Sequence, residues 1–113
     1  MEIKSVNDFK EYSSEKFTKR VMFKEGGSTV FVLNFEPGQT LPAHKHPGTN
    51  VYILVLNGSG TFTVDSKQQL LKEQDVLLIT GDEELSFENT GDQSVSLYVM
   101  LNKIPDERFT QDI

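Results

Sequence analysis

The sequence contains no cysteine, so disulfide bonds and thiolate metal sites are excluded. Basic residues are also scarce: 11 lysines and arginines stand against 17 aspartates and glutamates, which gives a formal net charge of −6. This balance argues against nucleic-acid binding, because phosphate recognition needs a basic patch. No hydrophobic run approaches the roughly 20 residues of a membrane-spanning helix. The composition and the polar start of the chain therefore predict a cytoplasmic protein that binds neither nucleic acid nor membrane.

A single domain is expected over residues 1–113, because the length is ordinary for one domain and no linker divides the chain. Its core should draw much of its volume from eight phenylalanines. Residues 1–18 are the least patterned segment, and they predict an arm that forms a short helix or an edge strand. Asn7 or Asp8 is the expected helix cap. Phe9, Tyr12 and Phe17 are expected to hold this arm against the main body.

Short alternating segments separated by turn residues dominate residues 20–101. In the segment 29–36 the odd-numbered side chains fall on one face, and 94–101 alternates in the same way. Asn57-Gly58 predicts a hairpin turn, and the segments 20–24 and 29–36 predict a hairpin around Gly26-Gly27. No long helix pattern is present, so the chain is typical of an all-β sandwich or barrel. The expected strands are 20–24, 29–36, 51–56, 61–65, 68–72, 76–79, 85–88 and 94–101.

The segments 51–56 and 76–79 are apolar on both faces, apart from the hydroxyl of Tyr52. A strand with two apolar faces is covered on both sides. One face should meet the barrel interior, and the other should meet either a second sheet of the same chain or a second copy of the chain. A homodimer is therefore a hypothesis, and both alternatives stay open at this point.

His44 and His46 are the only histidines, and they are separated by one residue. In an extended backbone, side chains two residues apart point to the same side. The pair could therefore hold one metal ion, or the two rings could be partly buried and hydrogen-bonded within the protein. Neither alternative is decided by the spacing alone.

The order Gly38, His44, His46 and a strand ending at Gly58 resembles the first motif of the cupin superfamily. Residues 74–89 resemble the second motif, with Asp75, four apolar residues, a turn and finally Asn89. The resemblance covers about residues 20–101. It implies a small single-domain cupin of the cupin 2-like kind, folded as a jelly-roll β-barrel with its site inside the mouth.

The resemblance also implies where metal ligands should stand. Cupin metal sites are typically built from two histidines and a glutamate of the first motif and one histidine of the second. His44 and His46 match the two histidines, but the glutamate position falls on Val51 and the second-motif histidine position falls on Leu85. The set is thus incomplete, and the aliphatic replacements make the site drier. A divalent transition metal (Zn, Ni, Mn or Fe) is expected to bind weakly or not at all.

A third metal ligand could come from three polar residues near the motifs. Asn50 could offer its carbonyl oxygen, Gln39 stands near the start of the first motif, and Glu84 is adjacent to Leu85. Glu84 is the better donor, but in a regular strand it points away from the face that Leu85 occupies.

Three functions follow from these observations. The first is a module that binds a small molecule in the barrel mouth, with a degenerate metal site. The second is a metal-dependent enzyme of the dioxygenase, isomerase or lyase kind that uses the two histidines. The third is a structural dimerisation domain without a ligand. No catalytic residue is assigned, and the ligand count favours the first function. The expected pocket residues are His44, His46, Asn50, Val51, Leu85 and Phe87.

Overall fold

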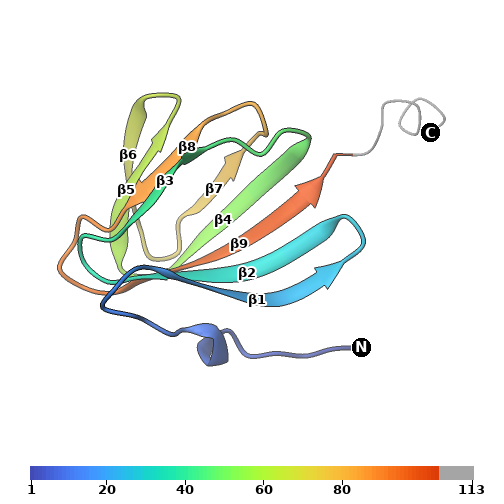
Figure 1. Cartoon of the computed structure of the whole chain (residues 1–113), viewed down its shortest axis with the longest axis horizontal. Helices are drawn as coiled ribbons and strands as arrows, with labels where there is room; N and C mark the ends of the chain where they lie inside the picture. The colour runs from blue at the N-terminus through green and yellow to red at the C-terminus, as the bar shows by residue number, and fades with distance from the viewer. Residues whose placement is uncertain (105–113) are drawn as a thin grey trace.

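The chain, seen in a computed structural model that describes residues 1–104, forms two antiparallel β-sheets that face each other (Figure 1). This arrangement confirms the predicted all-β jelly-roll barrel. Residues 1–104 contain no helix long and apolar enough to cross a membrane. The five-stranded sheet has the order β1 (Thr18–Glu25), β2 (Ser28–Phe35), β9 (Val95–Lys103), β4 (Thr49–Asn57) and β7 (Val76–Ile79). The four-stranded sheet has the order β3 (Thr40–His44), β8 (Leu85–Glu88), β5 (Ser59–Val64) and β6 (Lys67–Lys72).

The hydrophobic core lies between the two sheets, because alternate residues of each strand point inward. The rings of Phe35 and Phe87 lie 4.7 Å apart, and those of Phe87 and Phe62 lie 4.6 Å apart, so aromatic contacts join the sheets. Such pairs add about 0.5–1.5 kcal/mol each to the value of burial. The core consists of Phe31, Leu33, Phe35, Val51, Ile53, Val55, Phe62, Ile79, Leu85, Phe87, Val95, Leu97 and Val99.

Strand β3 was not predicted from the sequence. It lies at the edge of the four-stranded sheet and contains Pro42, which has no N–H to donate. Its pairing with β8 is irregular between Leu41 and His44. A short edge strand that is interrupted in this way leaves no clean alternation in the sequence. Nevertheless, β3 places His44 directly opposite Leu85 of β8.

The predicted hairpin turn at Asn57-Gly58 is wrong. Strands β4 and β5 belong to different sheets, so Gly58 is a corner where the chain crosses from one sheet to the other. Its φ of +80° lies in the left-handed region, and an added Cβ would come within 2.6 Å of the carbonyl oxygen of Ser94. Only glycine fits this corner. The β1–β2 hairpin is present as predicted, and β5 and β6 form a second one.

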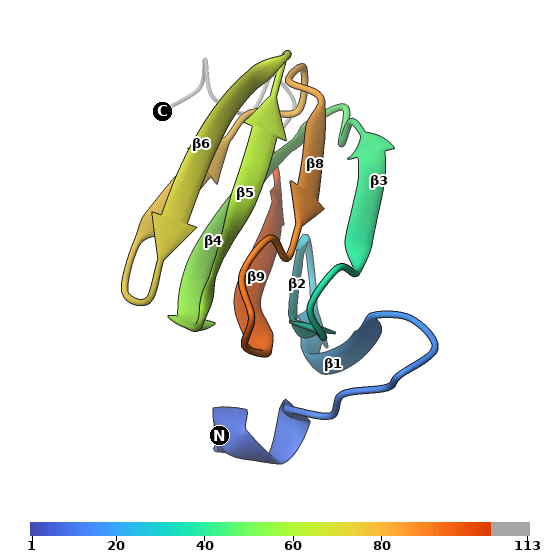
Figure 2. The ribbon, with the colours of Figure 1, turned by 90° about the vertical axis from the view of Figure 1, so that its left-hand side faces the viewer.

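The N-terminal arm contains one short 3-10 helix, η1 (Val6–Phe9), which confirms the predicted short helix. The predicted caps are wrong, because Ser5 stands at the N-cap and Asn7 and Asp8 lie within the helix. Asparagine and aspartate are common N-cap residues, which is why the sequence suggested them. In the structure the helix begins earlier, after Ser5, and the Ser5 side chain makes no capping hydrogen bond. The arm runs beside β1 and β2, below them in Figure 2.

The three predicted anchors hold this arm to the barrel. Phe9 joins an apolar cluster on the outer face of β1 and β2. Phe17 stacks on Phe35, with 5.1 Å between ring centroids. The Tyr12 hydroxyl lies 2.5 Å from Oγ of Ser96. The arm therefore contributes to both faces of the five-stranded sheet.

The outer face of β9, β4 and β7 is apolar and incompletely covered. Val76 is 69% exposed and Leu78 is 54% exposed. The four-stranded sheet packs on the inner face, and the arm covers the side of β1 and β2. Within residues 1–104, no second layer of the same chain covers β7. The register forms two apolar rows across the three strands, Met100–Tyr52–Leu78 and Tyr98–Leu54–Val76.

Candidate functional site: the barrel-mouth cavity

A cavity of about 160 Å³ opens between the sheets, at the end of the barrel where β3 ends and β4 begins. Its polar lining residues are Lys19, His44 and His46. Within the described residues 1–104, no aspartate or glutamate lines it. The remaining lining residues are all apolar: Phe17, Phe31, Leu33, Leu41, Val51, Ile53, Phe62, Leu85, Leu97, Val99 and Leu101.

Four of the six expected pocket residues line this cavity. His44 and His46 stand in the wall together with Val51 and Leu85, which are 1% and 2% exposed. The cross-strand pair of His44 and Leu85 places an aliphatic side chain beside an imidazole. The two positions where the resemblance implies metal ligands are therefore occupied by buried hydrocarbon.

The other two expected pocket residues do not line the cavity. Asn50 precedes Val51 in β4, so the strand alternation turns its side chain to the other face. Phe87 does face inward, but it lies deeper in the core, where its ring packs against Phe35 and Phe62. The prediction took both residues from the motif and did not resolve the strand face or the depth in the barrel.

The two imidazole rings lie side by side, with 4.6 Å between their centroids and 70° between their planes. Nδ1 of His44 lies 2.7 Å from the carbonyl oxygen of Pro42. A carbonyl only accepts hydrogen bonds, so Nδ1 carries the hydrogen and Nε2 of the neutral ring keeps a free lone pair. This backbone contact fixes the tautomer and orientation of His44.

The pKa of His46 is lowered from its ordinary value. The largest cause is burial, which penalises the charged ring, followed by repulsion from His44 and then from Lys19. His46 is therefore predominantly neutral at pH 7, and it can offer one ring N–H and one lone pair.

Acidification is expected to destabilise the protein through His46. In the unfolded chain the imidazole keeps its ordinary pKa of about 6.5, so below that pH the unfolded state takes up the proton before the folded state does. The free energy of unfolding should therefore fall as the pH drops from about 6.5 toward the lowered pKa of the folded state. Above about pH 6.5 the contribution of His46 should stay constant. Urea unfolding between pH 5 and 8, with a chelator present, measures this slope. A His46→Gln variant that keeps the full slope would contradict the assignment.

The candidates for a third metal ligand do not join the two histidines. The amide of Gln39 is already bonded, with Oε1 accepting from the backbone N–H of Glu36 and Nε2 donating to the carbonyl of Ser13. Glu84 is exposed in a loop outside the cavity wall. Among residues 1–104, no group of three or more histidine, cysteine, aspartate or glutamate side chains is placed to hold a metal ion. Two imidazoles fall short of the three protein ligands that catalytic metal sites use, so the donor set does not fit a tightly held metal.

Lys19 also lines the cavity, and the sequence does not predict its place there. It pairs with Leu33 in the β1–β2 register, so its side chain rises from the inner face of the sheet. Its Nζ lies 4.5 Å from the ring centroid of Phe31. The sequence does not reveal this position, because a register shift between Val21 and Phe23 moves Lys19 to the inner face. Extending the regular pairing of the hairpin turn would place Lys19 opposite Asn34, on the outer face.

Gly81 supports the turn that carries His46. An added Cβ would lie 2.3 Å from the carbonyl oxygen of His46 and 2.9 Å from that of Thr49. Gly81→Ala is therefore expected to lower the free energy of unfolding by about 1–3 kcal/mol through forced backbone displacement. Urea unfolding measures the loss, and NMR signals of the His46 ring report the displacement. Gly91→Ala is the matched control, because its Cβ would meet no atom closer than 3.4 Å. Equal losses in the two variants would contradict this role.

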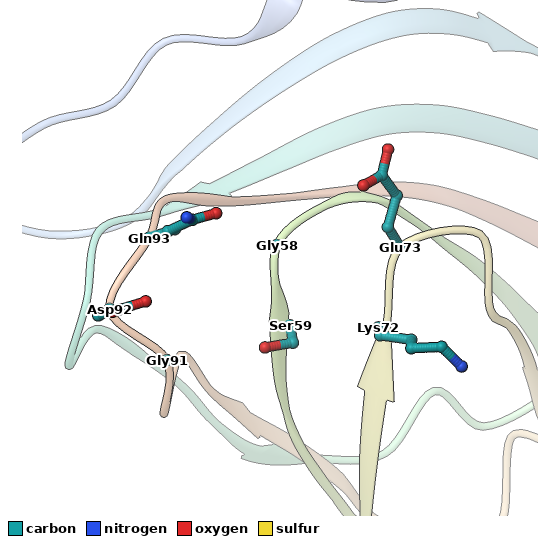
Figure 3. A pocket seen from close by; sticks show the side chains of 7 residues that line it. All are labelled: Gly58, Ser59, Lys72, Glu73, Gly91, Asp92 and Gln93. Atoms are coloured by element: carbon teal, nitrogen blue, oxygen red, sulfur yellow. The ribbon is translucent and has the colours of Figure 1, made fainter.

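A larger hollow, of about 420 Å³, lies at the opposite end of the barrel, where β4 ends. Figure 3 shows that its lining residues come from three segments, and that the Lys72 side chain points away from Asp92. The hollow does not bring its charged groups to a common centre. The barrel mouth is therefore the better candidate site.

Comparisons with known proteins agree with this architecture. A family model described as Cupin domain matches residues 31–101. A structure of the protein TT1209 from Thermus thermophilus is 23% identical with a TM-score of 0.86, and the match covers 93% of this chain and 100% of that one. An uncharacterised conserved protein with a double-stranded beta-helix domain from Klebsiella pneumoniae is 20% identical, with a TM-score of 0.85 and coverage of 91% and 90%. The Cnp3 cupin domain of Schizosaccharomyces pombe is 21% identical, with a TM-score of 0.76 and coverage of 86% and 72%. No curated protein matches the chain.

Proposed function

The chain belongs to the cupin family, and from that premise we propose that it binds a small molecule with an apolar body in the barrel-mouth cavity. The observation that carries this proposal is the replacement of two family ligand positions by buried Val51 and Leu85. These side chains turn a metal-binding mouth into an apolar cavity with a few polar groups at its rim. Cavities of that composition are typical of small-molecule sites.

The size of the cavity limits the ligand. An engineered cavity of about 150 Å³ lined by leucine, isoleucine and phenylalanine binds benzene. The mouth of this barrel, at about 160 Å³, has a similar volume and a similar lining. The apolar part of the ligand is therefore about the size of one six-membered ring.

Binding of benzyl alcohol, a neutral probe of this size, tests the proposal. Titration followed by amide NMR should shift the signals of Val51 and Leu85, which lie in the cavity wall. Leu101→Phe adds bulk at the half-buried edge of the wall and should abolish the shifts. Leu70→Phe adds the same bulk at a side chain that is 64% exposed on β6, and it should bind as the wild type does. Shifts that are absent in the wild type, or unchanged in Leu101→Phe, would contradict the proposal.

A metal-dependent enzyme is the second candidate, and the pair of adjacent imidazoles favours it. Nε2 of His44 is free in the neutral tautomer, and the His46 ring stands beside it. Metal content by plasma mass spectrometry, in the wild type and in a His44→Ala, His46→Ala double variant, separates the two functions. We expect far less than one metal ion per chain. Near-stoichiometric metal that disappears in the double variant would favour the enzyme instead.

We also propose that a second copy of the chain covers the outer face of β9, β4 and β7. The side chains in its two rows are uncharged, so a twofold pairing brings no like charges together despite the net charge of −6. Light scattering after size exclusion should give twice the chain mass of 12.8 kDa. Leu78→Lys should give the monomer, and Leu70→Lys, at a similarly exposed leucine on the other sheet, should leave the dimer intact. A wild type of 12.8 kDa at high concentration would exclude this interface.

A further inference from the structure

The barrel mouth has a charge that contrasts with the rest of the chain. The net charge is −6, yet the only formally charged side chain among the described lining residues is Lys19. No carboxylate from residues 1–104 lines the cavity to compensate it. An acidic protein therefore presents a cation at the entrance of an apolar cavity.

Lys19 is not neutralised by an ion pair elsewhere. The ion pairs within residues 1–104 are Lys4 with Glu2 and Arg20 with Glu11. The ammonium of Lys19 instead lies over the ring of Phe31, itself a lining residue. This cation–π contact holds the charge at the cavity rim and leaves the N–H donors of the ammonium available.

The neighbouring histidines complete a polar rim. Lys19 and His46 line the same cavity, so one ligand in it can meet both groups. Within the described residues, the His46 ring makes no hydrogen bond with protein, so its ring N–H is available to an incoming acceptor. His44 differs, because its Nδ1–H is already donated to the carbonyl oxygen of Pro42. Lys19 and His46 are therefore the donors that an anionic oxygen would meet.

We propose that the ligand is a compact monoanion, a carboxylate on an apolar body of about one ring, whose carboxylate binds Lys19 and His46 while the body fills the cavity. This inference rests on the proposed function, and it adds the charge of the ligand and the residue that selects it. An ammonium selects a carboxylate over a neutral group of the same shape because the charge-assisted hydrogen bond is stronger. The same cation disfavours amines.

The test compares benzoate with benzyl alcohol, which share the ring and differ in the charged head. In the wild type, benzoate should bind about 10-fold more tightly than benzyl alcohol in NMR titrations at low salt. Lys19→Gln should remove this preference and leave the affinity for benzyl alcohol unchanged. Lys45→Gln removes an equal charge from an exposed position between the two histidines that does not line the cavity, and it should keep the preference. Raising the salt concentration should weaken the binding of benzoate and leave the binding of benzyl alcohol unchanged.

The possible outcomes separate a failure of cavity binding from a failure of charge selection. If neither probe binds, the proposed function fails and this inference fails with it. If benzyl alcohol binds at the cavity and benzoate binds no more tightly, the cavity is a neutral binding site and the charge selection is wrong. Equal effects of Lys19→Gln and Lys45→Gln on benzoate would reduce the preference to general electrostatics and would also overturn the assignment of Lys19.

Discussion

Replacing Val51 by glutamate and Leu85 by histidine is expected to create a metal site at the barrel mouth. Both positions line the cavity together with His44 and His46, and Leu85 stands directly opposite His44 across the β3–β8 pair. The double substitution would give three imidazoles and one carboxylate, the donor types that zinc binds. Loss of an outer-shell partner alone costs metal affinity about 10- to 100-fold. Adding two direct ligands should therefore raise the affinity for Zn²⁺ or Ni²⁺ by more than about 100-fold.

The substitution should also make stability depend on the metal. Without metal, a carboxylate and an imidazole stand where Val51 and Leu85 were 1% and 2% exposed, so the apo variant should be several kcal/mol less stable than the wild type. When metal is added, the free energy of metal binding adds to the stability of the folded variant and offsets this loss. Thermal melts with and without a chelator, together with metal content by mass spectrometry, measure both effects.

A matched background controls for surface binding. The same two substitutions combined with His44→Ala and His46→Ala should bind no more metal than the wild type. If the double variant gains no metal affinity, the four positions do not converge as the cavity wall implies. If the gain persists without the histidines, the new site lies elsewhere.

Asn34→Ala is expected to lower the free energy of unfolding by about 2–4 kcal/mol, because it leaves several buried groups without partners. Asn34 and Ser96 are both 0% exposed. The Asn57 amide donates to the Tyr12 hydroxyl over 3.2 Å, and Oγ of Ser96 donates to Oδ1 of Asn34 over 2.6 Å. The single hydroxyl hydrogen of Ser96 is used in the bond to Asn34. In the contact between Tyr12 and Ser96, the Tyr12 hydroxyl is therefore the donor and Oγ of Ser96 the acceptor. Asn34 Nδ2 then donates to the carbonyl of Phe9 over 2.9 Å.

This chain of hydrogen bonds should behave as one unit. Tyr12→Phe removes one link and should cost about 1–2 kcal/mol. The double variant should lose less than the sum of the single losses, because both substitutions disrupt the same network. Urea unfolding of the four proteins gives the coupling. Purely additive losses would contradict the coupling between the two residues. A loss below about 0.5 kcal/mol for Asn34→Ala would show that the residue matters no more than an ordinary surface position.

The strands were predictable because a period of two survives in the sequence wherever one face is buried and no bulge intervenes. That holds for β9, where Val95, Leu97 and Val99 form the inner face. It fails for β1, where a register shift of one residue reverses the faces of the strand. Lys19 was missed for this reason. A bulge is a property of the paired strands, and the sequence of one strand does not reveal it.

The candidate site was predictable where a residue type carries its own chemistry. His44 and His46 are conspicuous in any chain that contains no other histidine, and the spacing of the motif locates Val51 and Leu85. Asn50 and Phe87 failed because strand face and depth in the barrel depend on the packed structure. The network around Asn34 has no sequence signature at all, because its members are separated by tens of residues and meet only when the arm folds against the sheet.

The position of β9 has a consequence for how the barrel assembles. Although it is the last of the described strands, β9 lies between β2 and β4, and its register joins Ser28 to Asn102. Pairings this distant in sequence close slowly, because a long loop must be ordered before they form. During synthesis, β2 and β4 must wait for β9 with their central backbone edges unpaired. The mouth of the barrel is therefore expected to form only after residues 95–103 are available to pair with both neighbouring strands.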